Sequence, residues 1–402
     1  MEGKDEERGK EKGCWLAFHQ ALGFGLNRWA GVLLRRYGTL AAAWQDPELT
    51  EGTWLPQEVR LKLLAARRKL RPEEILDRCA DRGIGILTLL DKEYPDSLLQ
   101  ISDNPVILYY YGKTELLKLP MVAVVGSRHC SGYGQLQAGE FSRRLAQAGL
   151  CIVSGLAKGI DGCAHRGALQ CGGATVAVLG SGVDVIYPRE NRGLYEQTCR
   201  EGLVLSELPP ETPPAPWTFP LRNRIISGLS LGVLLIEARA RSGALITSQL
   251  AAEQGRELWV LPGPVTNPAS IGPLQLIQDG ARAVITPGDI LRDLGILEEE
   301  TPPGRAGPGK AGGGPAGRNG PGKPGGAPAD RDGEGKGPLA RQVLMPGPEE
   351  AALLEKIGYG PVHVDRLLSL SGLLPGQLYL GLTNLVRLSL IERLPGDYYQ
   401  RI

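Results

Sequence analysis

The sequence Val-Ala-Val-Val-Gly-Ser-Arg at residues 122–128 decides how most of this chain is arranged. Its four small apolar residues predict a short buried strand that ends at Gly126. Ser127 and Arg128 follow at the carboxyl end of that strand, where open α/β sheets bind their ligands. Gly126 lets the backbone approach a ligand closely, Ser127 offers a hydroxyl, and Arg128 offers a planar fork for phosphate oxygens. The stretch therefore predicts one wall of an anion site.

Between residues 120 and 294, short apolar runs alternate with stretches of helical pattern. The runs lack polar alternation, which is typical of parallel strands that are covered on both faces. They predict strands at residues 122–125, 151–154, 175–179, 203–206, 233–236, 257–261 and 283–285. The predicted helices between them are residues 134–148, 161–170, 191–200 and 244–254. With two more strands at 86–90 and 106–111, residues 86–298 are predicted to form an α/β domain with a Rossmann-like, doubly wound, mostly parallel sheet.

Residues 14–85 carry apolar side chains near helical spacing and predict a helical amino-terminal domain. Residues 1–13 before it are a run of charges that we expect to be solvated and disordered. Gly23-Phe24-Gly25 resembles half of a helix-hairpin-helix, whose backbone amides contact a DNA phosphate. We favour a small SAM-like bundle in which these glycines only make a turn, because no second glycine hairpin follows.

Gly, Pro and Ala dominate residues 299–345, where no apolar periodicity remains, so we expect a flexible linker there. Residues 346–402 regain order, with predicted helices at 351–357, 362–370 and 375–388 and a hairpin of strands at 391–394 and 398–401. Three helices and a hairpin predict a carboxyl-terminal winged helix. Its third helix has only Arg387 near its end, so binding to DNA and binding to protein both stay open.

The composition limits the classes of function. A formal net charge of +1 excludes a generally basic nucleic-acid binder, so any such site must be local. The sequence has no apolar run of membrane-spanning length and no signal peptide, so we expect a cytoplasmic protein that binds no membrane. The seven cysteines are scattered without a Cys-x-x-Cys pair, which is typical of reduced thiols. The four histidines lack ligand-like spacing, so no metal site is predicted.

Glycines, hydroxyls and cations also flank the other predicted strands. Because the carboxyl ends of parallel strands meet at one edge of a sheet, we expect these residues to lie together. They are Ser154, Gly155, Lys158, Gly159, Arg222, Asn223, Arg224, Ser242 and Gly243. Helix amino termini and glycine loops of this kind form cradles of backbone N–H groups for anions. Together with Gly126, Ser127 and Arg128, they predict a composite anion site.

Several separated cradles fit a polynucleotide backbone better than a single nucleotide. Gly180-Ser181-Gly182 imitates the start of a dinucleotide fingerprint, but Val185 stands where its third glycine would fall. The phosphate-loop pattern Gly-x-x-x-x-Gly-Lys-Ser/Thr is absent from the sequence. A nucleotide at the Gly180 loop is therefore disfavoured, although it stays open because Glu207 follows the next strand, where a ribose-binding acid could stand.

Two aromatic residues, Trp217 and Phe219, stand just before Arg222. Aromatic side chains beside arginines hold single strands without sequence preference, at about 1–3 kcal/mol per stacked base. The alternative is that they plug the Pro-rich loop at residues 209–220 against the sheet. We favour the plug for Trp217 and the stacking role for Phe219.

Carboxylates near strand ends give little support for catalysis. Asp161, Glu207 and Glu237 could serve acid–base chemistry. Asp161 begins a helix, where an acid suits the dipole, and Glu237 can hold a neighbouring arginine. Cys163 and His165 are two residues apart on one helix and therefore point in different directions. We predict no catalytic residue and no cofactor.

Several motifs, in this order, resemble the DNA-processing protein A (DprA, or Smf) family. They are the segments at 125–128, 154–161 with His165, 180–191, 219–230, 237–238, 242–247 and 260–263. With the Tyr-Pro segment near Tyr94, the resemblance extends over most of residues 90–286. The longest read Ser-Gly-Leu-Ala-Lys-Gly-Ile-Asp and Phe-Pro-Leu-Arg-Asn-Arg-Ile-Ile-Ser-Gly-Leu-Ser. One departure is Leu274, which takes the place of an Asn that is usual in the family, so we do not expect a ligand contact there.

The resemblance implies a single-stranded-DNA-binding protein without enzymatic activity, usually a homodimer. Such proteins protect strands that enter during natural transformation and help load a RecA-type recombinase past single-strand-binding protein. On this resemblance, the segments at 126–128, 154–159 and 222–224 fall on the family's DNA pocket, and Phe219 falls where a base can stack. The alternative is a nucleotide-processing enzyme such as a phosphoribohydrolase on the same fold, but the Pro-Gly-Gly-x-Gly-Thr loop of such enzymes is absent here.

Overall fold

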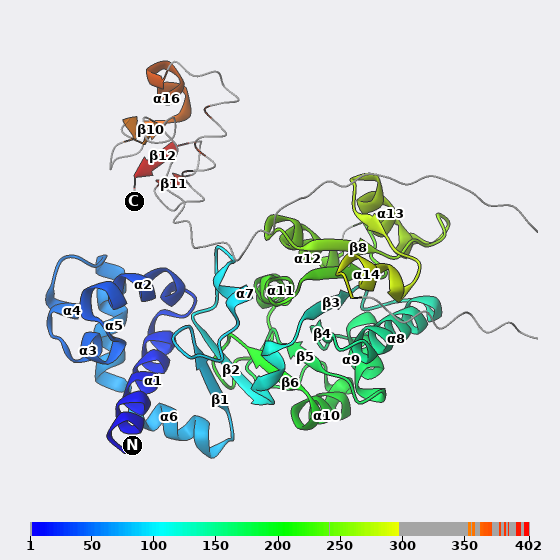
Figure 1. Ribbon diagram of the computed structural model, residues 1–402. Helices are drawn as coiled ribbons and strands as arrows, with labels where there is room; N and C mark the ends of the chain where they lie inside the picture. The colour runs from blue at the N-terminus through cyan, green and yellow to red at the C-terminus, as the bar shows by residue number, and fades with distance from the viewer. Residues whose placement is uncertain are drawn as a thin grey trace, which may run out of the picture. The chain divides into compact units, whose positions relative to one another are not determined.

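The computed structural model describes residues 2–240 and 242–296. Of the carboxyl-terminal part it describes residues 353, 354, 356, 357, 362–371, 378, 382, 385, 391–394 and 398–401. The chain forms two compact units, Met1–Thr301 and Pro302–Ile402 (Figure 1). Each unit is described by itself.

Six helices form the start of the first unit. They are α1 (Glu2–Leu22), α2 (Gly25–Tyr37), α3 (Leu40–Gln45), α4 (Glu48–Glu51), α5 (Gln57–Lys69) and α6 (Pro72–Asp81). Trp15, Phe18, Leu26 and Leu33 form their shared core and are fully buried. Gly23, with a φ of 56°, makes the turn between α1 and α2, as the bundle interpretation expects.

The charged start of the chain is helical, so the prediction of a disordered segment at residues 1–13 is wrong. Its charges have partners far away in the sequence. Arg8 forms an ion pair of 2.7 Å with Asp91, and the Lys12 ammonium donates to the carbonyl of Ile86 at 2.9 Å. Glu11 accepts from the amide of Leu40 at 2.9 Å at the start of α3. These contacts give the charged side chains partners within the protein, whereas the sequence alone suggests that only water solvates them.

A nine-stranded sheet, in the order β1-β2-β6-β5-β4-β3-β7-β8-β9, forms the centre of the first unit (Figure 1). Its strands are β1 (Gly85–Thr88), β2 (Ile107–Gly112), β3 (Met121–Val125), β4 (Cys151–Ser154), β5 (Thr175–Val178), β6 (Leu203–Ser206), β7 (Gly232–Leu235), β8 (Glu257–Val260) and β9 (Arg282–Ala283). All seven strands from β3 to β9 run parallel to one another, and β1 and β2 add an antiparallel pair at one edge of the sheet. This is the predicted Rossmann-like, mostly parallel sheet.

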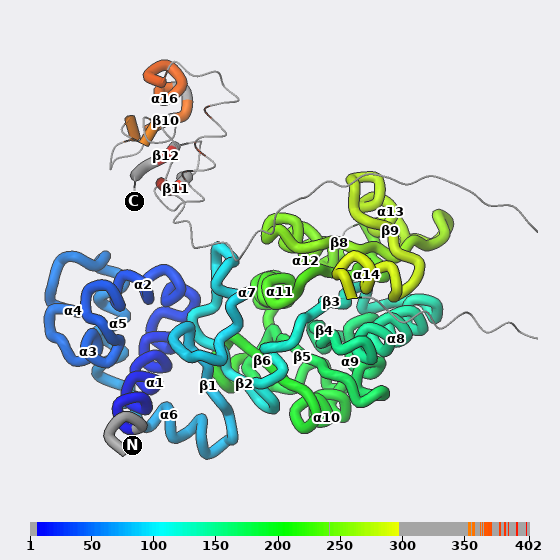
Figure 2. The backbone as a smooth tube through the Cα atoms, viewed as in Figure 1, coloured from blue at the N-terminus to red at the C-terminus, as the bar shows by residue number. Residues whose placement is uncertain are grey.

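Helices cover both faces of the sheet, as a doubly wound fold requires. One face packs on α8 (Gly132–Gln147), α9 (Ile160–Gln170) and α14 (Pro287–Asp293), with α10 (Arg192–Glu201) and the amino-terminal bundle beside them. The other face packs on α7 (Asp96–Leu99), α11 (Thr218–Leu229), α12 (Gly243–Glu253) and α13 (Ile271–Gln278) (Figure 2). Both faces of β3 are fully lined with apolar side chains, which is why its sequence shows no polar alternation.

Helix α11 is the main element that the sequence did not predict, because we assigned residues 209–220 to a Pro-rich loop. Pro220 lies in the first turn of α11, where proline is tolerated because the amide has no helical partner there. Residues 222–229 are buried on all sides of the helix, so the amphipathic pattern that reveals surface helices is missing.

In the second unit, β10 (Val362–His363), β12 (Tyr398–Arg401) and β11 (Ile391–Leu394) form a three-stranded antiparallel sheet beside α16 (Val364–Ser371). Val364, Leu367, Ile391 and Tyr399 lie in its buried core. Both strands of the predicted hairpin are confirmed, and residues 362–363 form a strand rather than a helix start. The linker lies outside the described residues, as do most of the other two predicted helices.

Candidate nucleic-acid interface

The order of the strands creates a crevice beside β3. After β3 the chain adds β4, β5 and β6 on one side, and then crosses through α11 to place β7 on the other side. Ligands of open α/β sheets bind at such a reversal, outside the carboxyl ends of the strands. The amide of Ser127 after β3 donates to the carbonyl of Glu237 after β7 at 2.7 Å, which ties the two strand ends together.

A cavity of about 660 Å³ opens at this crevice. The predicted site residues that line it are Gly126, Ser127, Arg128, Phe219, Arg222, Asn223, Ser242 and Gly243. A smaller cavity of about 220 Å³ adjoins it and shares Arg128 and Phe219. Gly155 and Lys158 line this smaller cavity. The structure thus brings together residues from four of the predicted segments.

Arg128, Phe219 and Tyr187 stack at the boundary between the two cavities. The Arg128 guanidinium carbon lies 4.8 Å from the centroid of the Phe219 ring. The Tyr187 ring lies 5.8 Å from Phe219 at an interplanar angle of 38°. Arg128 is exposed, so its positive charge faces the solvent at the cavity mouth. A cation on an aromatic surface is suited to a phosphate with a neighbouring base.

Arg222 forms the floor of the larger cavity. It is 7% exposed, and its guanidinium donates to the carbonyl of Val178. Burial lowers the pKa of Arg222 to about 10, so it remains a cation at neutral pH. A side chain at Gly155 would bring its Cβ atom within 2.0 Å of that guanidinium, so only glycine leaves room for it. Asp161 accepts from the Gly155 amide at 3.1 Å, and burial raises the pKa of this carboxyl while Arg222 opposes the shift.

Two further features add positive potential. Lys158 pairs with Glu190, but their side chains are 50% and 64% exposed, so solvent weakens the pair and the ammonium stays available to a phosphate. The amino terminus of the eleven-residue helix α12 begins at Gly243, after Ser242 has capped it by accepting from the Ala244 amide. Its partial positive charge faces the cavity wall that Ser242 and Gly243 form.

Three predicted site residues do not line either cavity. Ser154 is fully buried and donates to the carbonyl of Val124 at 2.7 Å. Gly159 has a φ of 74° and packs closely against the loop after β3, since a Cβ atom there would lie 2.3 Å from the carbonyl oxygen of Ser127. Both residues shape the site without lining it. The third predicted site residue that lines neither cavity is Arg224.

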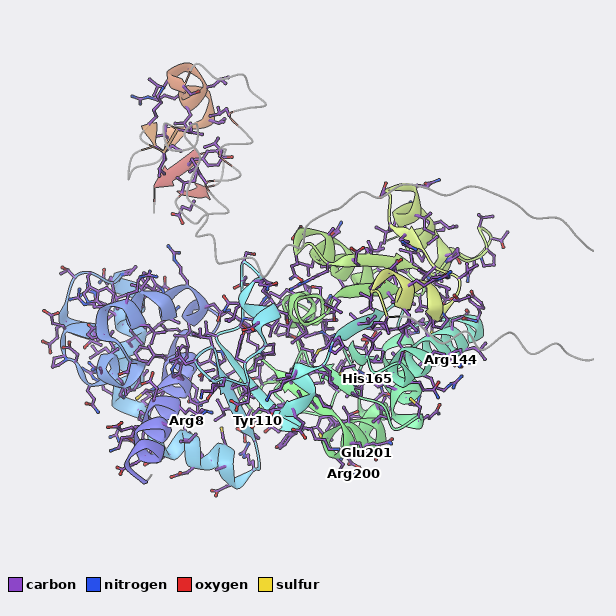
Figure 3. All side chains as sticks on the ribbon, in the orientation of Figure 1. Arg8, Tyr110, Arg144, His165, Arg200 and Glu201 are labelled. Atoms are coloured by element: carbon purple, nitrogen blue, oxygen red, sulfur yellow. The ribbon has the colours of Figure 1, made fainter. Side chains whose placement is uncertain are left out.

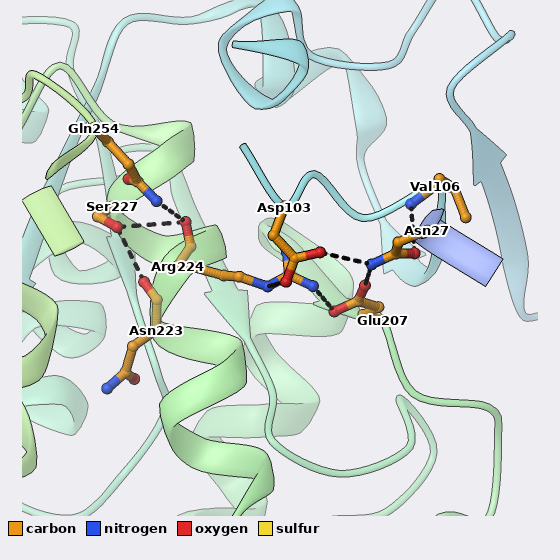
Figure 4. A network of polar contacts seen from close by, with 8 residues as sticks. All are labelled: Asn27, Asp103, Val106, Glu207, Asn223, Arg224, Ser227 and Gln254. Atoms are coloured by element: carbon orange, nitrogen blue, oxygen red, sulfur yellow. Dashed lines mark hydrogen bonds and ion pairs between the residues drawn. The ribbon is translucent and has the colours of Figure 1, made fainter. Parts of the chain in front are cut away.

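Arg224 lies on the side of α11 that faces away from the cavity, which corrects our expectation for it. Its guanidinium forms ion pairs with Glu207 and, at 3.3 Å, with Asp103 (Figure 4). Its side chain is 6% exposed. We expected Arg222 and Arg224 on the same edge of the sheet, but two residues along a helix turn a side chain by about 200°. Arg222 therefore reaches the cavity and Arg224 does not.

The carboxylates near the strand ends have structural partners. Glu237 accepts from the Ser131 amide at 2.8 Å and from its hydroxyl at 2.6 Å, and so holds the amino terminus of α8 rather than an arginine. His165 on α9 is fully buried, with Nδ1 2.7 Å from the Thr175 hydroxyl, and burial lowers its pKa to about 3 (Figure 3). No group of three or more His, Cys, Asp or Glu side chains that could hold a metal ion occurs among the described residues.

The chain packs closely against part of the Gly180 loop, while Gly180 and Ser181 also line the smaller cavity. A Cβ atom at Gly182 would lie 2.7 Å from the carbonyl oxygen of Pro209, and one at Gly180 would lie 2.8 Å from the Phe219 ring. The loop that precedes α11 therefore covers the fingerprint-like turn. This close packing is a further difference from a dinucleotide-binding loop, beside the missing third glycine.

Sequence reasoning left some lining residues out of the site. Tyr187 is close to Arg189 and Arg192 in the sequence, but its place against Phe219 depends on folding of the distant α11. Arg239 also lines the larger cavity and is exposed. Its position two residues after Glu237, beyond the end of β7, was a signal that could have found it.

Comparison with known proteins identifies the family. Residues 85–295 match the sequence model of DNA recombination-mediator protein A, and residues 337–397 match the DprA winged helix domain. Protein Smf of Synechocystis sp. is 34% identical over 419 residues, which cover 97% of this chain and 99% of that protein. The chain belongs to the DNA recombination-mediator protein A (DprA/Smf) family.

Two further comparisons concern the DprA of Streptococcus pneumoniae. Its sequence is 48% identical over 207 residues, or 52% of this chain and 73% of that protein. Its X-ray structure superposes with a TM-score of 0.60 at 38% identity, and covers 68% of this chain and 96% of that one. The DprA resemblance of the motifs is thereby confirmed, as is a Rossmann-like domain with a winged helix. Within the described residues, no helix is long and apolar enough to cross a membrane.

Proposed function

We propose that this DprA-family protein binds single-stranded DNA without sequence preference in the cavity beside β3. The observation that carries the proposal is the stack of Arg128 on Phe219 in the same cavity as the buried cation Arg222. Stacked aromatics beside cations bind any base and any phosphate. The family description, a DNA recombination mediator, supports the same substrate class.

The mediator role itself is the second part of the proposal. We propose that the bound strand is protected from degradation and passed to a RecA-type recombinase during natural transformation or recombination, with single-strand-binding protein as a competitor. The protein acts as a cytoplasmic homodimer and uses neither catalysis nor a cofactor. The support is family membership together with carboxylates near the cavity that are engaged in capping and ion pairing.

Fluorescence anisotropy with labelled oligo-dT and with duplex, at several salt concentrations, tests DNA binding. Among the described residues, four cations line the two cavities, namely Arg128, Lys158, Arg222 and Arg239. For four phosphate contacts on a single strand, we expect log K to fall with log salt at a slope of about −3. Arg128→Ala is expected to weaken binding and to reduce the slope by about 0.7.

Arg200→Ala is the matched control, because Arg200 is exposed in the last turn of α10, the end of that helix remote from the strand ends that form the site (Figure 3). We expect Arg200→Ala to bind like wild type. Failure of the wild type to bind single strands at low salt would overturn the proposal. A nucleotide-processing enzyme would then become the better hypothesis.

A further inference from the structure

The first turn of α2 docks the amino-terminal bundle directly against the central domain. The Asn27 side-chain amide donates to Glu207 at 3.0 Å and accepts from the amide of Val106 at 3.4 Å (Figure 4). Glu207 is itself held by Arg224 of α11, the helix that carries the cavity residues. Polar contacts therefore fix the start of α2 relative to the cavity.

Beside this contact, an exposed tryptophan spans the junction. The ring of Trp217 meets that of Phe24, at the turn before α2, edge to face with centroids 6.0 Å apart. Trp217 is nevertheless 57% exposed, so it does not plug the loop against the sheet as we had favoured. Pro216 lines the larger cavity, and Phe219 forms part of its stack. Trp217 lines neither cavity, but it lies in the chain between the cavity residues Pro216 and Phe219, and much of its side chain is open to solvent.

A cation continues this surface along α2. Arg28 is exposed, and its guanidinium carbon lies 5.5 Å from the centroid of the Trp29 ring. Residues four apart in a helix share a face, which places Arg28 next to Phe24. Leading away from the cavity, the chain thus presents Phe219, Trp217, Phe24 and Arg28 in turn. Aromatic rings with a cation beside them are the chemistry that binds an extended single strand.

We propose that single-stranded DNA leaving the cavity continues over Trp217 onto the start of α2, where Trp217 stacks a base and Arg28 binds a phosphate. This inference rests on the proposed function and adds a second subsite that the amino-terminal bundle helps to build. The continuity with the cavity and the positive charge of Arg28 favour a nucleic acid over an apolar protein segment. The bundle thereby becomes part of the DNA-binding surface without acting as a helix-hairpin-helix.

Binding of oligo-dT of two lengths to the full chain tests the second subsite. An oligomer of about 5 nucleotides fills the cavity alone, whereas one of about 16 also reaches α2. We expect Trp217→Ala to weaken binding of the long oligomer about tenfold, within the range for loss of one stacked base, and to leave the short one unchanged. Trp217→Phe is expected to retain most of the affinity. Arg28→Ala is expected to reduce the salt slope by about 0.7 for the long oligomer only.

Leu61→Ala is the matched control, because Leu61 is also 57% exposed but lies on α5. Equal affinity of wild type and Trp217→Ala for the long oligomer would overturn the inference. Equal weakening for both lengths would also overturn it, because Trp217 would then belong to the cavity. If the wild type binds neither oligomer, the proposed function itself fails, which is a distinguishable result.

Discussion

The ion pair between Arg224 and Glu207 is predicted to stabilise the fold and to contribute no DNA contact. The two side chains are 6% and 4% exposed. Removal of one partner from such a pair leaves an uncompensated buried charge, which costs about 3–5 kcal/mol of unfolding free energy. In Glu207→Gln, Arg224 keeps its contact with Asp103, which is 58% exposed, so we expect a loss near the lower value, about 3 kcal/mol.

Thermal unfolding and DNA titration of the same variants give the two readouts. A loss of about 3 kcal/mol lowers the midpoint by about 6–12 °C in a domain of this size. The double variant Glu207→Leu with Arg224→Met replaces the pair by apolar side chains, and we expect it to recover most of the stability. The salt slope for the oligomer of about 5 nucleotides, which tests the cavity alone, is expected to match that of wild type in both variants, measured below their unfolding transitions.

The opposite pattern would refute this reasoning. If Arg224→Met unfolds like wild type and reduces the salt slope by about 0.7, Arg224 contacts a phosphate, and our assignment from the sequence was right after all. Arg222→Met is the internal comparison, because Arg222 lines the cavity and is expected to change DNA affinity.

Gly155→Ala is expected to reduce DNA affinity at least tenfold with the fold retained, because the new Cβ atom displaces the Arg222 guanidinium; unchanged affinity in the titration would contradict the role of this glycine. Acid is expected to destabilise the protein below pH 6.5, because burial lowers the pKa of His165 to about 3 and that of His19 to about 4 from 6.5, so the unfolded state binds more protons. Each histidine contributes about 1.4 kcal/mol per pH unit to the slope of the unfolding free energy against pH. His19→Gln should therefore reduce this slope, measured with urea between pH 6 and 4.5, by about 1.4 kcal/mol per pH unit. An unchanged slope would contradict burial of a neutral imidazole.

The strands of the central sheet could be predicted to within a residue or two. Buried parallel strands are short apolar runs, so β4 and β6 are found with the predicted ends, and β3 begins one residue earlier than predicted. Their carboxyl ends then identified part of the cavity lining, such as Gly126, Ser127 and Arg128 after β3, since the fold brings strand ends to one edge. This part of the site can be predicted from the apolar pattern of the strands and from the rule that ligands bind outside the carboxyl ends of parallel strands.

The other parts of the fold and of the site could not be predicted, because they depend on contacts between residues that are far apart in the sequence. Helix α11 is buried on all sides, so its sequence lacks a helical stripe, and without that helix the opposite directions of Arg222 and Arg224 could not be foreseen. The helical conformation of the charged start depends on partners such as Asp91, 83 residues away from Arg8. The exposure of Trp217 depends on how α2 docks.

The most direct test of the central claim is photo-crosslinking of a 5-iodouracil-substituted oligo-dT, followed by mass spectrometry of the linked peptides. We predict crosslinks to Phe219 and Tyr187, the aromatic rings that stack with Arg128 at the boundary of the two cavities. We also predict that Arg128→Ala abolishes them at moderate salt. Crosslinks confined to the winged helix, with none at Phe219 or Tyr187, would contradict the claim that the cavity beside β3 binds the strand.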